Sequence, residues 1–137
     1  MKPLDIPVEE FTSTNPVIVH EGDSLEDLEA TMKENGIRHL PVARGQEIVG
    51  IISQRDLKVA SRLGKYRDMI CAKDIMIETP FTVSSSTKLD DVAFAMSKNK
   101  IGSAIVNDEN GNFLGIFTST DALNALIEVV RGIDPNQ

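Results

Sequence analysis

The chain has 137 residues, a formal net charge of −7 at pH 7, a single cysteine and only 4% aromatic residues. One cysteine excludes an internal disulfide and a zinc site built on several thiolates, and the acidic charge disfavours nucleic acid as a partner. No apolar run approaches the roughly 20 residues of a membrane span, and no secretion signal is visible. We therefore expect a soluble cytoplasmic protein that does not insert into a membrane.

The chain contains an internal repeat. Residues 15–37 align without a gap over residues 79–101, and residues 47–56 align over 112–121 after one inserted loop residue. The identical pairs of the first block are Pro16 and Pro80, Val19 and Val83, Leu25 and Leu89, Asp27 and Asp91, Met32 and Met96, Asn35 and Asn99, and Ile37 and Ile101. A period of this kind indicates two copies of one structural unit.

In chain order, each copy predicts a strand, a helix, two strands and a closing helix. The first copy has a short strand at 17–19, a helix with Leu25, Leu28 and Met32 on one stripe, strands at 37–43 and 47–53, and a helix at about 56–63. The second copy repeats this order with strands at 81–83, 101–107 and 112–118 and a closing helix at about 121–130. We expect an α/β (α+β) fold in which two β-α-β-β-α repeats pack with pseudo-twofold symmetry.

The repeats divide the chain into five predicted parts. We expect residues 1–12 to form an N-terminal segment packing on the pair, 13–63 the first repeat, 64–78 a linker, 79–130 the second repeat and 131–137 a C-terminal tail.

A hydroxyl followed three residues later by a carboxylate ends the hairpin of each copy, as Ser53 with Asp56 and as Thr118 with Asp121. At the start of a helix, free amides and the helix dipole favour a phosphate, and an Asp can accept ribose hydroxyls. The same spacing is also typical of a helix capping box, which we expect without a ligand role at Ser24–Asp27 and Thr87–Asp90. Both interpretations stay open at this point.

The Pro before each first strand, the hydroxyl–carboxylate ending and the duplication together resemble tandem CBS (cystathionine beta-synthase) domain pairs of the stand-alone prokaryotic type, over roughly residues 11–130. The resemblance implies two clefts between the repeats that bind AMP, ADP, ATP or S-adenosylmethionine. It places Thr118, Thr120 and Asp121 at the phosphate and ribose of one ligand. Ser53, Arg55 and Asp56 would hold the other, where Arg55 replaces a small hydroxyl residue and favours either a more highly phosphorylated ligand or a salt bridge that fills the cleft.

The same resemblance assigns residues that line the two clefts. Those expected beside Asp121 are Ile37, Arg38 and His39, and those expected beside Asp56 are Ile101, Gly102, Ser103, Lys73 and Ile75.

The function implied by the resemblance is regulatory, as in energy-sensing proteins. We expect a homodimer that binds an adenosine-containing small molecule, needs no cofactor or metal, and acts on an effector protein in trans unless the chain is a fragment of a longer protein. The alternative is a structural oligomerisation module with empty clefts. An enzyme ranks third, because no activated nucleophile, acid–base pair or metal-ligand set is visible in the sequence.

Three further features of the sequence have ordinary interpretations. His20 and His39 lack the spacing of a zinc site, and Cys71 is expected to be a partly buried, inert thiol. Residues Asp108–Gly111 are expected to form a hairpin turn instead of a calcium loop, because the glycine stands at the wrong position for one.

Overall fold

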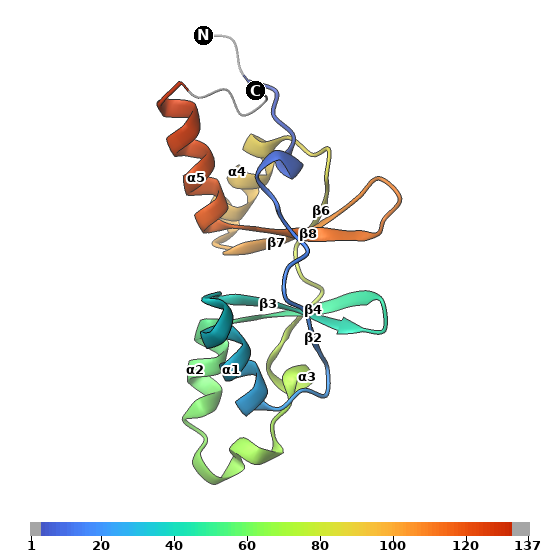
Figure 1. Cartoon of the computed structure of the whole chain (residues 1–137), viewed down its shortest axis with the longest axis vertical. Coiled ribbons are helices and arrows are strands. Elements are labelled where there is room, and N and C mark those ends of the chain that lie inside the picture. Colours follow the sequence, from blue (N-terminus) through green and yellow to red (C-terminus); the bar gives the residue numbers. More distant parts are fainter. Residues whose placement is uncertain (1–3, 133–137) are drawn as a thin grey trace. The chain divides into compact units, whose positions relative to one another are not determined.

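The structure, a computed structural model, describes residues 4–132 of the chain and consists of two compact units (Figure 1). The first-repeat unit is Val17–Pro80, and the second-repeat unit combines the N-terminal residues up to Pro16 with the residues from Phe81 on. Each unit has its own sheet and its own helices. Within residues 4–132, no helix is both long enough and apolar enough to cross a membrane.

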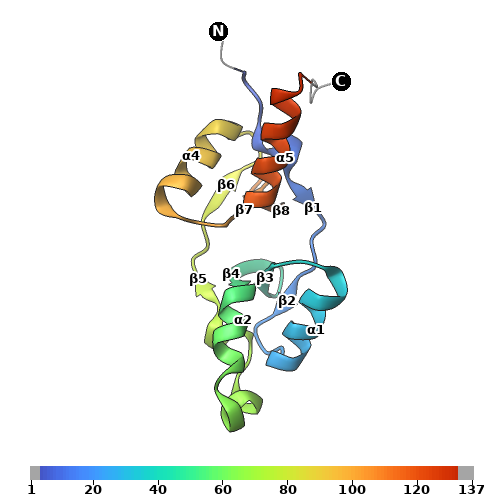
Figure 2. The same cartoon turned by 90° about the vertical axis from the view of Figure 1, so that its left-hand side faces the viewer.

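The first-repeat unit has a four-stranded sheet in the order β2-β3-β4-β5, with β2 parallel to β3 and the other pairs antiparallel. Its strands are β2 (Val19–His20), β3 (His39–Arg44), β4 (Glu47–Ser53) and β5 (Ile77–Glu78), and its helices are α1 (Leu25–Asn35), α2 (Gln54–Ser61), α3 (Ala72–Ile75) and a 3-10 helix (Gly64–Met69). Helices α1 and α2 contact each other and lie side by side in both views (Figures 1 and 2).

The core of this unit confirms the predicted helical stripe. Leu25, Leu28 and Met32 of α1 are buried against Leu40 of β3 and Ile52 of β4. Burying one such aliphatic side chain stabilises the fold by about 1.5–3 kcal/mol, so the stripe fixes which face of α1 meets the sheet.

The second-repeat unit repeats this plan, with strand order β1-β8-β7-β6. Its strands are β1 (Ser13–Thr14), β6 (Thr82–Ser84), β7 (Ser103–Asn107) and β8 (Phe113–Thr118), and its helices are α4 (Leu89–Asn99), α5 (Ser119–Val130) and a 3-10 helix (Val8–Phe11). Val92 and Met96 of α4 are buried with Phe117 of β8 and with Val8. The predicted order of strand, helix, two strands and helix is therefore confirmed in both copies.

The segments that precede the two copies exchange units. Strand β1 opens the stretch predicted as the first repeat but pairs with β8 of the second-repeat unit, and β5 ends the predicted linker but pairs with β4 of the first-repeat unit. The N-terminal segment is held further by backbone hydrogen bonds from Val8 N to Thr87 O (2.8 Å) and from Leu89 N to Ile6 O (2.7 Å). The sequence analysis missed both edge strands, because two residues show no alternation of polar and apolar side chains.

The helix starts differ from the predicted ones by a residue or two. Helices α2 and α5 begin at Gln54 and Ser119, earlier than predicted, because Ser53 and Thr118 are the N-caps. Ser24 caps α1, with its Oγ accepting a hydrogen bond from Asp27 N (3.1 Å), but among residues 4–132 the Asp27 side chain does not return the second bond of the predicted capping box. The capping box predicted for Thr87 and Asp90 is wrong. The N-cap of α4 is Lys88, the residue aligned with Ser24, and it makes no side-chain cap.

The predicted hairpin turn after β7 is confirmed. Asp108 Oδ1 accepts hydrogen bonds from Asn110 N and Asn112 N, both at 2.9 Å, and Gly111 has a positive φ of 82°. The carboxylate is thus used to close the turn.

Replacing Gly115 by alanine should separate β1 from β8. A Cβ at Gly115 would collide with the Ser13 carbonyl, a backbone atom that cannot move aside as a flexible side chain would. We expect Gly115→Ala to lower the free energy of unfolding by about 1–3 kcal/mol in urea denaturation. Gly22→Ala is the matched control, since a Cβ there meets nothing within 4 Å. Equal stability of the two variants would contradict the close approach of β1.

Candidate functional site

The first hydroxyl–carboxylate motif stands where β4 ends and α2 begins. Asp56 Oδ2 accepts hydrogen bonds from Ser53 N (2.8 Å) and Ser53 Oγ (2.9 Å), and Asp56 N donates to Ser53 Oγ (3.2 Å). This reciprocal pair is a capping box. The capping interpretation of this motif is therefore confirmed.

The second motif has the same geometry where β8 ends and α5 begins. Asp121 Oδ2 accepts from Thr118 N (2.9 Å) and Thr118 Oγ1 (3.1 Å), and Asp121 N donates to Thr118 Oγ1 (3.3 Å). In addition, Ser13 Oγ of β1 donates to Asp121 Oδ1 at 3.4 Å. The exchanged edge strand therefore reaches the carboxylate of this motif.

Capping uses only one oxygen of each carboxylate. Among residues 4–132, Asp56 Oδ1 has no hydrogen-bond partner, and Asp121 Oδ1 has only the long bond from Ser13. Both aspartates are half-buried. Each motif therefore keeps an oxygen that can accept a further hydrogen bond.

The structure brings Arg38 and His39 beside the first motif. His39 of β3 is paired with Ser53 of β4, and Gln54 N donates to Arg38 O at 2.8 Å. Burial lowers the pKa of the half-buried His39, while the Asp56 carboxylate raises this pKa and Arg38 lowers it. Ile37 is half-buried and packs against the core of the same unit. The predicted assignment of these three residues to Asp121, which belongs to the other unit, stays a prediction.

The second unit has the equivalent arrangement. Ser103 of β7 is buried and paired with Thr118, and Ser119 N donates to Gly102 O at 3.1 Å. Ile101 packs against the core of this unit. The assignment of Ile101, Gly102 and Ser103 to the cleft of Asp56 likewise stays a prediction.

The remaining predicted residues lie on the first turns of helices. Lys73 and Ile75 belong to α3, which contacts α2 and β4 of the first-repeat unit. Arg55 and Thr120 occupy aligned, exposed positions in α2 and α5. Among the residues that the structure describes, Arg55 forms no ion pair, so the salt-bridge alternative has no support from its own unit.

A further capping pair, which the sequence did not predict, lies at the start of α3. Asp74 Oδ2 accepts hydrogen bonds from Cys71 N (2.9 Å) and Cys71 Sγ (3.3 Å). The bond from the Cys71 backbone, followed by the one from its thiol, lowers the pKa of Asp74. Cys71 is half-buried, as predicted. The spacing of Cys71 and Asp74 matches the other motifs, but cysteine is not a usual capping residue.

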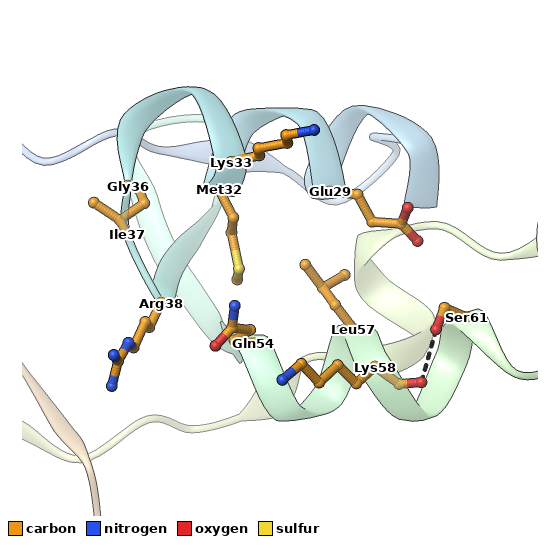
Figure 3. A pocket seen from close by; sticks show the side chains of 10 residues that line it. All are labelled: Glu29, Met32, Lys33, Gly36, Ile37, Arg38, Gln54, Leu57, Lys58 and Ser61. Carbon is orange, nitrogen blue, oxygen red and sulfur yellow. Dashed lines mark hydrogen bonds between the residues drawn. The ribbon is translucent and has the colours of Figure 1, made fainter.

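Each unit also has a groove between its two main helices, which sequence reasoning did not find. The α1–α2 groove has a volume of about 530 Å³, and the α4–α5 groove has about 430 Å³. Figure 3 shows Met32 of α1 and Leu57 of α2 pointing toward each other across the first groove. The residues lining the α1–α2 groove are Glu29, Met32, Lys33, Gly36, Ile37, Arg38, Gln54, Leu57, Lys58 and Ser61.

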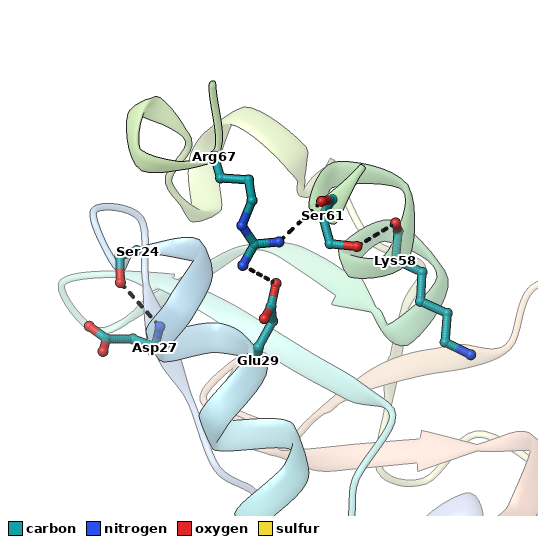
Figure 4. Close-up of polar contacts among 6 residues, drawn as sticks. All are labelled: Ser24, Asp27, Glu29, Lys58, Ser61 and Arg67. Atoms are coloured by element: carbon teal, nitrogen blue, oxygen red, sulfur yellow. Dashed lines mark hydrogen bonds and ion pairs between the residues drawn. The ribbon is translucent and has the colours of Figure 1, made fainter. Parts of the chain in front are cut away.

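Arg67 joins two of the residues that line the α1–α2 groove, Glu29 and Ser61. Arg67 Nη2 donates to Glu29 Oε1 (3.0 Å), and Arg67 Nη1 donates to Ser61 O (3.2 Å), as Figure 4 shows. This side chain therefore ties the segment after α2 to both helices. It also forms an ion pair with the Glu29 carboxylate.

His39 should titrate below its ordinary pKa. We expect an NMR titration of the imidazole to give a pKa below about 6.5, and Asp56→Asn to lower it further, since that carboxylate raises it. The unfolded chain then binds more protons than the native one between the two pKa values. The stabilisation given by neutral His39 is therefore complete above about pH 6.5 and is lost as the pH falls through the native pKa. In His39→Gln this part of the pH dependence should disappear, and a native pKa at or above 6.5 would refute the burial argument.

The comparisons with known proteins agree with this geometry. A model of the family described as "CBS domain" matches residues 8–62 and again residues 72–128. An inosine-5'-monophosphate dehydrogenase of Korarchaeum cryptofilum is 32% identical over 113 residues, which are 82% of this chain and 23% of that enzyme. The chain spans 45% and 54% of the next two curated relatives.

Two solved structures have a fold similar to that of this chain. CBSX2, a CBS-pair protein from Arabidopsis thaliana solved in complex with AMP, is 26% identical with a TM-score of 0.79, covering 91% of this chain and 98% of that one. The CBS domain pair of protein MJ0100, solved with 5-methylthioadenosine and S-adenosyl-L-methionine, is 26% identical with a TM-score of 0.80, covering 93% and 99%. With two tandem matches and a fold shared over almost its whole length, the chain belongs to the CBS domain family.

Proposed function

We propose that this chain is a regulatory module that binds an adenosine-containing nucleotide at its two hydroxyl–carboxylate motifs. The observation that carries the proposal is that both motifs keep an Asp oxygen outside the cap, at the start of a helix. The complexes of two similar CBS pairs with AMP, 5-methylthioadenosine and S-adenosyl-L-methionine support an adenosine ligand.

The chemistry of the motifs suits the parts of a nucleotide. A ribose presents two hydroxyl donors, and a carboxylate oxygen that is fixed in position by a cap can accept from them. Phosphate is favoured by the free amides and dipole at the starts of α2 and α5. We assign these roles to Thr118, Thr120 and Asp121 in one site and to Ser53, Arg55 and Asp56 in the other.

The side chains for the base come from the first residues after α1 and α4. Ile37 and Ile101 offer half-buried apolar surface. His39 and Ser103 stand opposite Ser53 and Thr118 in the registers of their hairpins. Lys73 and Ile75 belong to the same proposed site as Asp56. We propose that the Asp121 site is the tighter one, because Arg55 replaces the small hydroxyl residue Thr120 at the aligned position.

Binding regulates only if the ligand has different affinities for two states of the protein. We propose that the output is a change in a homodimer or in an effector protein that acts in trans. No catalytic role is part of this proposal, and the relation to a dehydrogenase concerns only a part of that enzyme's length.

A structural oligomerisation module is the second candidate. Two observations favour it: both aspartates already cap helices, and several large apolar side chains are exposed on α4 and α5. Among these are Phe94, which is 67% exposed, and Leu123, Leu126 and Val130, which are 59%, 57% and 75% exposed. In that case the motifs serve folding alone.

Calorimetric titration with AMP, ADP, ATP and S-adenosylmethionine distinguishes the candidates. We expect at least one ligand to bind, Asp121→Asn to weaken the tighter event by about ten-fold or more, and Asp56→Asn to weaken the other, because each loses a charged acceptor. Ser24→Ala controls for capping alone: it removes the cap of α1 and should cost about 1 kcal/mol of stability while the affinity stays the same. The structural module would be favoured if no ligand gives heat at millimolar concentration, or if both Asp variants bind with the affinity of the unmodified chain.

A further inference from the structure

The two helix grooves occupy equivalent places in the two repeats but differ in chemistry. The α4–α5 groove is lined by residues that align with nine of the ten lining the α1–α2 groove. Those residues are Ala93, Met96, Ser97, Lys100, Ile101, Gly102, Ser119, Ala122 and Leu123. One scaffold therefore presents two different surfaces.

The floors of the two grooves are similar. Met32 and Ile37 are matched by Met96 and Ile101, and both methionines are buried. The shared residues are those that also pack against the cores of the units. Similar floors are therefore expected from the fold alone and point to no ligand.

The rims differ in charge. Lys33, Arg38 and Lys58 line the α1–α2 groove, from α1, from the residue before β3, and from α2. The aligned residues of the other groove are Ser97, Gly102 and Leu123. The first groove therefore gathers three cations in a chain whose net charge is −7.

The carboxylate that lines the groove already has an ion-pair partner. Glu29, the acid that lines the groove, is bound by Arg67, which lies outside it. Within residues 4–132, Lys33, Arg38 and Lys58 take part in no ion pair. Cations that share a groove repel one another unless an anion lies between them.

We propose that the α1–α2 groove is a second binding site, for the oligophosphate group of a soluble ligand. A volume of about 530 Å³ is within the range of small-molecule pockets. The two lysines supply point charges from opposite helices, and Arg38 supplies a planar fork of donors. The groove shares Arg38 with a predicted nucleotide cleft, whereas Lys33, Lys58 and Gln54 have no part in the proposed nucleotide sites.

Inorganic tripolyphosphate is the probe, titrated into the full chain and followed by calorimetry and by backbone amide NMR. We expect saturable binding, with amide chemical-shift changes concentrated at the C-terminal end of α1 and the start of α2. Lys33→Ser and Lys58→Leu, which install the residues of the other groove, should each weaken binding by about ten-fold.

Lys100→Gly is the matched control. It removes one cation from the α4–α5 groove at a position with a positive φ of 56°, where glycine is well tolerated. Its affinity for tripolyphosphate should equal that of the unmodified chain. Loss of affinity in this control as large as in Lys58→Leu would show unspecific attraction and overturn the proposal, as would the absence of binding at millimolar tripolyphosphate.

Adenosine separates this site from the nucleotide motifs, because it carries no phosphate. The variant that combines Lys33→Ser with Lys58→Leu should bind adenosine as the unmodified chain does and lose tripolyphosphate. If the chain binds adenosine but not tripolyphosphate, the proposed groove site is refuted and the proposed nucleotide function is not. Tripolyphosphate binding that is unchanged in the double variant refutes it as well.

Discussion

The close pairing of a short lead-in strand with the second strand of each hairpin is the contact on which both units depend. At Gly115 it requires glycine, because a Cβ there would collide with the backbone of Ser13, while a Cβ at Gly50 would meet the flexible side chain of Met76. An unpaired strand edge leaves backbone donors and acceptors without partners, and the lead-in strand covers part of that edge. The first-repeat unit is therefore the continuous stretch Val17–Pro80, whereas the second-repeat unit needs the N-terminal residues up to Pro16 as well as those from Phe81 on.

This pairing also determines the surroundings of the motifs. The strands that receive the lead-in segments, β4 and β8, are the ones that end at Ser53 and Thr118. In the second-repeat unit the lead-in strand even supplies a hydrogen bond, from Ser13 to Asp121. The hydroxyl–carboxylate pairs thus have a structural role that holds with or without a ligand. Capping fixes one carboxylate oxygen and leaves the other directed by a rigid helix start, which is the kind of preorganisation that a binding site needs.

The duplication has left the two units similar in the core and different at the surface. Core positions such as Met32 and Met96 keep their residue type because a change there would cost packing energy. Rim positions are solvated, and they differ freely, as Lys58 and Leu123 do. The exposed residues Arg55 and Thr120, which occupy aligned positions in the two motifs, differ in the same way. Differences between repeats are therefore a better guide to unequal ligands than the residues they share.

The sequence by itself determined the duplication, the order of elements, the buried stripe of α1 and the hydroxyl–carboxylate spacing at Ser53 and Thr118. These are local or periodic features, since helical burial repeats every few residues and a cap needs only a neighbouring turn. Only the tertiary structure decided that β1 pairs with β8, that Lys88 is the N-cap of α4, and that Lys33 and Lys58 line one groove. The pairing of β1 could not be predicted because a strand of two residues shows no periodicity. The N-cap of α4 could not be predicted because a shift of one residue changes which side chain is the cap. The groove could not be predicted because it brings together side chains that are far apart in the chain.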